Sequence, residues 1–338
     1  MKYLFSCFCI SLLITSCALN WEDESDNPVN SFDYFWKEMK YYYPGFIKSD
    51  LDWDSVYATY KPLIKDDPTN ENLRKILIEI TNMINDEHMR IYFSKSDIYP
   101  DLPNSDEIFM HSIISNYVVF ENSSHEEMYS YGFINDNIGY MWIKRFHGEG
   151  MSASAWAKDA AKTIKSFEFC KALIVDVRNN DGGNLLNAEE ILKYFITENI
   201  MNYSTQYWKT GPEYNDYQYN KSGSIKKADY TFNKPVILLM NTGCVSTTDF
   251  LGVLMKHNDL AILVGESNII SIIGDTYPVE LPNGWLVQFG RFAHEIYDGQ
   301  YSEGDILQMD HEVSNAKEAL NEGVDTQLEY ALQLVDSM

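Results

Sequence analysis

Positively charged residues are few in this 338-residue sequence. It has 26 Lys and Arg residues against 50 Asp and Glu residues, which gives a formal net charge of −24 at pH 7. Nucleic acids and anionic lipid headgroups attract Lys and Arg and repel an acidic chain. We therefore expect no nucleic acid among the partners of this protein, and no binding to an anionic membrane surface through charge.

Cysteines and metal-binding motifs are few as well. The sequence has five cysteines and seven histidines, with no Cys-x-x-Cys and no His-Glu-x-x-His pattern among them. It therefore predicts no metal site. Only Cys170 and Cys244 lie beyond the first 17 residues. Each lies next to a different predicted strand, and we do not expect a disulfide between them.

No stretch of the sequence is long and apolar enough to span a membrane, and the one apolar run at the start is short. Residues 3–15 are almost wholly apolar and follow a single charge at Lys2, but the stretch is too short to cross a bilayer as a stable helix. It leads into Ile14-Thr15-Ser16-Cys17, which resembles the lipobox of bacterial lipoproteins. An ordinary secretory signal with a chance cysteine is the alternative.

The polar, acidic residues 20–27 favour the lipobox interpretation, because they are suited to a tether. We expect residues 1–16 to be a signal peptide, Cys17 to carry the lipid, and residues 17–30 to link it to the folded part. Acyl chains on Cys17 would then hold the protein at a membrane of the bacterial cell envelope without a transmembrane helix.

Strands and helices alternate in the sequence from about residue 131 onward. Residues 172–177 and 235–240 form apolar runs of strand length, and a helical pattern follows each of them. Near-continuous apolar strands that alternate with helices are typical of a parallel sheet covered on both faces. The predicted fold class is therefore α/β, with one α/β domain over residues 131–338.

The residues before this domain have a helical pattern. Aromatic residues recur at helical spacing over residues 32–39, and a second amphipathic run covers residues 73–84. We interpret residues 31–97 as a small helical N-terminal domain and residues 98–130 as a connecting segment. Inside the α/β part, the Tyr-rich residues 196–234 are interpreted as a long polar connection.

Two loops follow strands at the predicted carboxyl edge of the sheet, where open α/β sheets bind their ligands. One is Asp176-Val177-Arg178-Asn179-Asn180-Asp181-Gly182-Gly183, whose glycine pair permits positive φ and lets backbone N–H groups face a ligand. In the other, Ser246 begins a helix directly after a buried strand. Free N–H groups and the helix dipole favour a developing oxyanion there.

Two other interpretations of the second loop stay open. Ser246 can be a plain N-cap whose capping box is completed by Asp249. Cys244, two residues earlier, is the rival nucleophile, although a buried structural thiol is the commoner role for a cysteine within such a turn.

Seven segments, in one order along most of the chain, resemble the tail-specific (C-terminal processing) and tricorn-core serine peptidases. The most specific is 172–183, which is very close to the family signature Leu-Ile-Ile-Asp-x-Arg-x-Asn-x-Gly-Gly. Ser246-Thr247-Thr248-Asp249 corresponds to a nucleophile motif usually read Ser-Ala-x-Glu. The other five are Phe32-Asp33-Tyr34-Phe35-Trp36 with Tyr43-Pro44-Gly45-Phe46, Asn85-Asp86-Glu87-His88, Ile138-Gly139-Tyr140 with Phe146, Gly265-Glu266, and residues 303–313.

The resemblance implies a ClpP/crotonase-like α/β core, hydrolysis of peptide bonds through an acyl-enzyme, and no cofactor. It implies that Ser246 is the nucleophile. The backbone N–H groups of Gly182 and Thr247 would form the oxyanion hole, with Gly183 as the other choice of glycine. His88 would be the general base, a role that an imidazole suits near neutral pH.

The resemblance also implies that Glu303 orients His88, either through a relay at Glu87 or with Glu87 orienting the ring itself. Ser271 stands where many of these peptidases carry a lysine base, so a Ser-Lys dyad is not expected. The stretch between His88 and Ile138 is too short for the PDZ domain that many relatives insert there.

The residues after the candidate nucleophile, Thr247-Thr248-Asp249, are an unusual version of the family motif. They leave two alternatives open. One is a catalytically inactive lipoprotein that binds a peptide or an apolar ligand on the same scaffold. The other is a non-peptide hydrolase or lyase of the wider crotonase-like group.

We expect Cys17→Ser to release the protein from the membrane fraction or to stall removal of the signal peptide, because serine cannot accept the thioether-linked lipid. Fractionation of cells that express the full-length wild type and variant measures this. Unchanged sedimentation of the Cys17→Ser protein with membranes would contradict the anchor.

Overall fold

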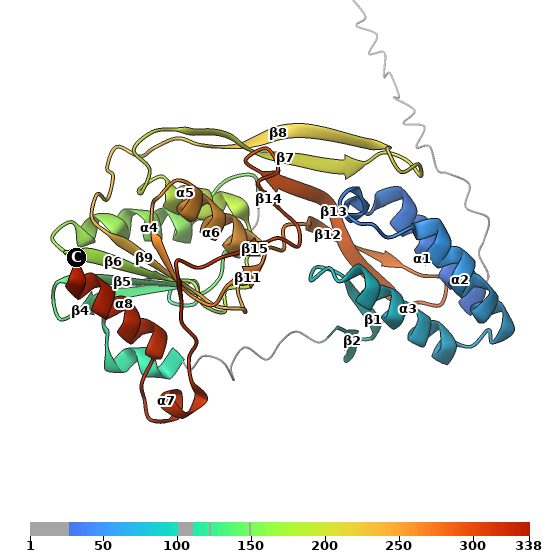
Figure 1. Cartoon of the computed structure of the whole chain (residues 1–338), viewed down its shortest axis with the longest axis horizontal. Coiled ribbons are helices and arrows are strands. Elements are labelled where there is room, and N and C mark those ends of the chain that lie inside the picture. The colour runs from blue at the N-terminus through green and yellow to red at the C-terminus, as the bar shows by residue number, and fades with distance from the viewer. Residues whose placement is uncertain (1–26, 101–110, 122, 149) are drawn as a thin grey trace, which may run out of the picture.

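The computed structural model describes residues 27–100, 111–121, 123–148 and 150–338. The predicted signal peptide and Cys17 lie outside these residues. The described chain forms two lobes that lie side by side, and a long β-hairpin arches over both of them (Figure 1). No helix in the described ranges is long and apolar enough to cross a membrane.

The larger lobe is built on a seven-stranded sheet with the strand order β16-β10-β9-β6-β5-β4-β3. Its strands from β5 to β16 are parallel, and β4 and β3 extend it in antiparallel fashion. The strands are β3 (Val119–Glu121), β4 (Tyr129–Ile134), β5 (Ile138–Ile143), β6 (Ala172–Asp176), β9 (Val236–Met240), β10 (Ile262–Gly265) and β16 (His311–Glu312).

Helices cover both faces of this sheet, which explains its apolar central strands. Every residue of β6 and β9 is buried. Successive side chains of a strand point to opposite faces. Leu173 and Val175 therefore pack under α4 (Ala155–Thr163), α5 (Leu185–Leu192) and α6 (Thr247–His257), while Ile174 packs under α8 (Thr326–Ser337). The predicted α/β class and its parallel sheet are confirmed.

The smaller lobe combines N-terminal helices with strands from much later in the chain. The helices α1 (Pro28–Tyr42), α2 (Trp53–Asp66) and α3 (Asn70–Ile84) share one hydrophobic core with Ile273, Val287 and Phe289. The sheet of this lobe runs β2-β1-β13-β7-β8, with β12 and β14 also paired to β13. Its strands are β1 (Arg90–Ser94), β2 (Asp97–Tyr99), β7 (Ile200–Lys209), β8 (Tyr217–Ile225), β12 (Gly274–Glu280), β13 (Leu286–Ile296) and β14 (Tyr301–Ser302).

The interpretation of residues 196–234 as a polar connection was wrong. Most of this segment is the hairpin of β7 and β8, which reaches from the larger lobe to the N-terminal helices (Figure 1). Most of β8 is exposed or half-buried, so its sequence lacks the apolar alternation that marks a half-buried strand. Backbone pairing with β7, which itself pairs with β13, holds β8 in place.

Short elements complete the chain. Near the end of the chain a separate short helix precedes α8. The short elements are β11 (Asn268–Ile269), β15 (Ile306–Leu307), α7 (Lys317–Asn321) and the 3-10 helices at Pro44–Ile47, His111–Asn116 and Ile164–Phe167.

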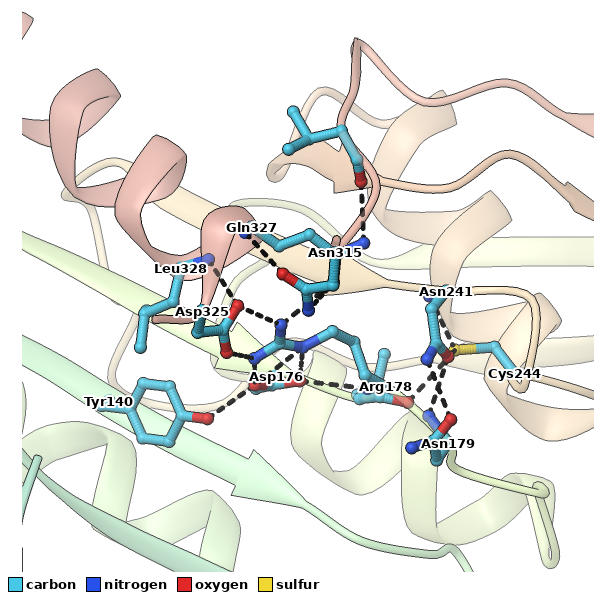
Figure 2. A network of polar contacts seen from close by, with 12 residues as sticks. Tyr140, Asp176, Arg178, Asn179, Asn241, Cys244, Asn315, Asp325, Gln327 and Leu328 are labelled. Carbon is cyan, nitrogen blue, oxygen red and sulfur yellow. Dashed lines mark hydrogen bonds and ion pairs between the residues drawn. The ribbon is translucent and has the colours of Figure 1, made fainter. Parts of the chain in front are cut away.

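A buried guanidinium joins the sheet to α8. Arg178 is fully buried just after β6 and forms ion pairs with Asp176 at 2.5 Å and with Asp325 at 2.8 Å (Figure 2). Tyr140 on β5 donates to the Asp176 carboxylate at 2.6 Å, and Gln327 accepts from Arg178 Nη1 at 3.0 Å. Asp325 also caps α8, because its Oδ1 accepts the N–H of Leu328.

We expect Asp325→Asn to lower the free energy of unfolding by about 3 kcal/mol, the lower end for loss of one partner from a buried ion pair, because Asp176 remains. Asparagine can still cap α8, so the substitution removes the charge of residue 325 without removing the cap. Burial alone would raise the pKa of Asp325, but Arg178 outweighs it and holds that pKa below its usual value. The stabilisation is therefore present above about pH 4 and is lost as the pH falls further, so the deficit of the variant should shrink in acid.

Urea unfolding of both proteins between neutral and acidic pH measures this difference. The matched control is Asp336→Asn, which removes an exposed pair with Lys171 and should change the free energy by less than about 0.5 kcal/mol. Equal effects of the two substitutions would contradict the importance of the buried pair.

Candidate active site

Ser246 lies on a strained turn between β9 and α6. Its backbone has φ 63° and ψ −120°, a conformation that costs a residue with a Cβ about 1–3 kcal/mol. The Asp249 carboxylate holds this conformation by accepting the Ser246 N–H at 2.9 Å. Ser246 is only half-buried. A strained strand-to-helix turn of this kind is a known way to present a serine nucleophile to a substrate.

The glycine-bearing loop after β6 lies directly against this turn. Gly182 has φ 86°, and a Cβ there would lie 2.8 Å from Ser246 Cβ and 3.0 Å from Thr247 N. Thr247 Oγ1 donates to the Gly183 carbonyl at 2.6 Å. The two loops that the sequence placed at the carboxyl edge of the sheet are thus in contact, and only glycine fits at the point where they meet.

Two asparagines hold the loops together. Asn180 Oδ1 accepts the Gly182 N–H at 2.9 Å, and the Asn180 carbonyl accepts from Val245 N at 3.2 Å and from Thr248 Oγ1 at 3.0 Å. Asn241 exchanges hydrogen bonds with Asn179, at 2.9 and 2.8 Å (Figure 2). The positions of both loops are therefore set by each other.

Two backbone N–H groups remain available as oxyanion donors. In the part of the chain that the structure describes, the N–H groups of Thr247 and Gly183 form no hydrogen bond, whereas that of Gly182 donates to Asn180. Thr247 is the first residue of α6, so its N–H points out of the helix N-terminus.

Cys244 occupies the core under this turn. It is fully buried, its Sγ donates to the Val177 carbonyl at 3.1 Å, and burial raises the pKa of its thiol to about 12. A neutral, buried thiol is a poor nucleophile. Cys170 is also buried, and both cysteines are free, in agreement with the expected absence of a disulfide between them.

His88 reaches the site from the smaller lobe, in the turn between α3 and β1. Its backbone N–H donates to Asp86 Oδ1 at 2.8 Å, and its Nδ1 lies 3.0 Å from Ser271 Oγ and 3.6 Å from Asp86 Oδ1. Among the described residues, no hydrogen bond joins the ring to Ser246. Tyr43 donates to the other oxygen of Asp86 at 3.0 Å and so fixes this carboxylate.

Asp249 connects the Ser246 turn to Ser271. Its Oδ2 accepts the N–H of Ser246 at 2.9 Å and that of Ser271 at 3.0 Å, and its Oδ1 accepts from Asn268 at 2.8 Å. Ser246 and Asp249 thus form the capping box that the sequence left open as an alternative, and the Asp249 carboxylate serves a second segment too. Burial raises the pKa of Asp249 to about 8, although its three N–H donors act in the opposite direction.

Glu303 supports the segment that follows Ser271. Its Oε2 accepts the N–H groups of Ile272 at 2.5 Å and Ile273 at 2.9 Å. Burial and the nearby charge of Asp86 raise the pKa of Glu303 to about 8. Within the described structure no hydrogen bond joins Glu303 or Glu87 to His88. Glu303 is connected to the imidazole only through the segment that begins at Ser271.

A cavity of about 320 Å³ opens between the two lobes next to these groups. Its lining includes Tyr43, Phe46, Asp86, Ser271, Ile273 and Glu303. No three His, Cys, Asp or Glu side chains of the described residues gather as metal ligands would. Sequence reasoning noted Ser271 only as the replacement of a lysine and missed its contact with His88, for which the sequence holds no local signal.

The chain is similar to known proteins in both sequence and structure. Residues 137–313 match the model of peptidase family S41, and residues 27–82 match that of the tricorn protease C1 domain. The carboxy-terminal processing protease CtpB of Bacillus subtilis is 28% identical over 169 residues, which are 47% of this chain and 32% of that protein. The chloroplastic carboxyl-terminal-processing peptidase 2 of Arabidopsis thaliana is 25% identical over 135 residues, 40% of this chain and 24% of that protein. The chain thus spans about a third or less of the length of these relatives.

Two solved structures resemble the whole described chain. A candidate peptidase from Parabacteroides merdae is 29% identical with a TM-score of 0.75, over 92% of this chain and 99% of that one. A lipoprotein from Streptococcus agalactiae has a TM-score of 0.54 at 12% identity, over 92% and 96%, which is a likeness of fold alone.

We expect the free energy of unfolding of the wild type to fall, relative to that of Asp249→Asn, as the pH rises from about 4 to about 8. In that range the unfolded chain has released the Asp249 proton while the folded protein still holds it, so the difference changes by at most about 1.4 kcal/mol per pH unit. Glu303 is common to both proteins and largely cancels. Denaturant unfolding of the pair across this range is the measurement, and a constant difference would mean that Asp249 is ionised in the folded state.

Proposed function

Because this chain belongs to peptidase family S41, we propose that it is a serine peptidase that hydrolyses peptide bonds through an acyl-enzyme on Ser246. The observation that carries the proposal is the strained backbone of Ser246, which faces the glycine loop; among the described residues the N–H groups of Thr247 and Gly183 beside it form no hydrogen bond. A scaffold that only bound a peptide would have no use for this strain, which argues against the inactive alternative.

In the proposed reaction Ser246 Oγ attacks the scissile carbonyl carbon and passes its proton to His88 Nε2. The N–H groups of Thr247 and Gly183 hold the resulting oxyanion. We propose Gly183 in place of Gly182 because the Gly182 N–H already donates to Asn180. His88 then gives the proton to the leaving amine, and water releases the acyl group in a second round of the same steps.

His88 must approach Ser246 for this transfer. In the free protein the two are connected through Ser271 and Asp249. Catalytic hydrogen bonds commonly tighten only when the substrate is bound. We propose that Glu303 contributes by holding the backbone of Ile272 and Ile273, which follow the His88 partner Ser271, rather than by touching the ring.

The substrate is proposed to be a peptide or protein that reaches Ser246 through the cavity between the lobes. We further propose that the enzyme works at a membrane of the bacterial cell envelope, held there by lipid on Cys17. The support for this anchor is the sequence Ile14-Thr15-Ser16-Cys17 before a polar segment.

We expect Ser246→Ala to abolish labelling by a fluorophosphonate probe and to lower peptide turnover by about 10⁴-fold or more, because the acyl-enzyme cannot form.

His88→Ala should remove most turnover, and Glu303→Gln should lower it partially. Turnover is measured by mass spectrometry with a mixed peptide library.

Cys244→Ser is the control, and it should still be labelled. Labelling that survives Ser246→Ala and disappears in Cys244→Ser would move the nucleophile to Cys244. Turnover that survives His88→Ala and rises only in alkali would point to a lysine base elsewhere in the chain.

A further inference from the structure

Two oxygen atoms converge on one ring nitrogen of His88. Nδ1 lies 3.0 Å from Ser271 Oγ and 3.6 Å from Asp86 Oδ1. Ser271 is 1% exposed and the His88 side chain 16% exposed, so water competes little for this contact. The Asp86 carboxylate is itself fixed, since it accepts the His88 N–H and the Tyr43 hydroxyl.

The hydroxyl of Ser271 belongs to a segment whose backbone is anchored at three successive residues. The Ser271 N–H donates to Asp249 Oδ2, and the N–H groups of Ile272 and Ile273 donate to Glu303 Oε2. Asp249 Oδ2 is the same oxygen that accepts the Ser246 N–H. The distance between the nucleophile turn and the Ser271 hydroxyl is therefore set by one carboxylate.

The two acceptors select one tautomer of the imidazole. A serine hydroxyl can accept from Nδ1–H or donate to a bare Nδ1, but a carboxylate can only accept. The Asp86 carboxylate on the same side therefore favours a proton on Nδ1, with Ser271 Oγ as its acceptor. The lone pair is then on Nε2, the nitrogen that a general base requires.

We propose that Ser271 is a positioning residue, which holds His88 in the Nδ1–H tautomer so that Nε2 can accept the proton of Ser246. This inference rests on the proposed function for its catalytic meaning. The structural part stands on the contacts of His88 alone. Ser271 lines the cavity, so its own hydroxyl proton can point there while its oxygen accepts from Nδ1.

The test compares Ser271→Thr with Ser271→Val in the full-length chain. The two side chains have the same shape, but only threonine keeps the hydroxyl. Long-range proton–nitrogen NMR of histidine-labelled protein at alkaline pH reports the tautomer, and His88→Gln assigns the signal. We expect the Nδ1–H form in the wild type and in Ser271→Thr, and its loss in Ser271→Val.

Kinetics give the second readout. Ser271→Val should lower kcat by about tenfold to hundredfold, part of the 10²–10⁴-fold that a positioned general base contributes, with KM changed less than about twofold. Ser271→Thr, which keeps the hydroxyl, should have a kcat close to that of the wild type. If valine prevents folding, Ser271→Ala replaces it in both measurements.

A matched pair elsewhere controls for loss of any buried Ser–His contact. Ser204 Oγ lies 3.0 Å from His294 Nδ1, between β7 and β13. Ser204→Ala removes that contact and should leave the His88 signal and kcat unchanged.

Three results overturn the inference: an Nε2–H form of His88 in the wild type, a tautomer unaffected by Ser271→Val and Ser271→Ala, or an unchanged kcat in an active enzyme. The tautomer does not depend on turnover. A wild type that cleaves no peptide but shows the Nδ1–H form, lost with the hydroxyl, would therefore refute the proposed function while supporting the role of Ser271 in orienting the ring.

Discussion

The guanidinium of Arg178 is sealed from water, so its charge must be compensated inside the protein. Asp176 supplies one carboxylate from the end of β6, and Asp325 supplies the other from the first residue before α8. The end of β6 and the start of α8 therefore cannot separate without leaving a buried charge unpaired or exposing it to water. The same loop continues into Asn179, which pairs with Asn241 before the Ser246 turn. The buried charge thus lies where the glycine-bearing loop of the candidate site begins.

Carboxyl groups also organise the candidate active site, and two of them have pKa values near neutrality because burial outweighs their N–H donors. Asp249 and Glu303 each accept two backbone N–H groups on a single oxygen, and between them they fix Ser246 and the segment from Ser271 to Ile273. The pKa of each of these two carboxyl groups is raised to about 8. A rise in pH through this value therefore adds negative charge next to the Ser246 turn and the segment that contacts His88.

The sequence was sufficient for the parts of this structure that depend on local patterns. The apolar runs at β6 and β9 identified the central strands, and the position of Ser246 between a strand and a helix followed from them. The β7–β8 hairpin was missed because its outer strand faces solvent and shows no apolar period. The contact between Ser271 and His88 joins residues 183 positions apart, so it depends on how the lobes pack rather than on either segment. The hydrogen bond from the Gly182 N–H to Asn180 depends on the backbone dihedral angles of the loop. A Gly-Gly pair permits many such angles, so the sequence alone could not predict this bond.

The core of the smaller lobe has a consequence for how the protein acquires its structure. Its helices come from the first quarter of the chain, but the strands that cover their apolar faces, β12 and β13, come from the last quarter. During synthesis these helices leave the ribosome long before their partners exist, so their apolar surface stays open until most of the polypeptide has emerged. His88 acquires its partner at the same late stage. A nascent chain that ends before β13 therefore cannot carry an assembled candidate site.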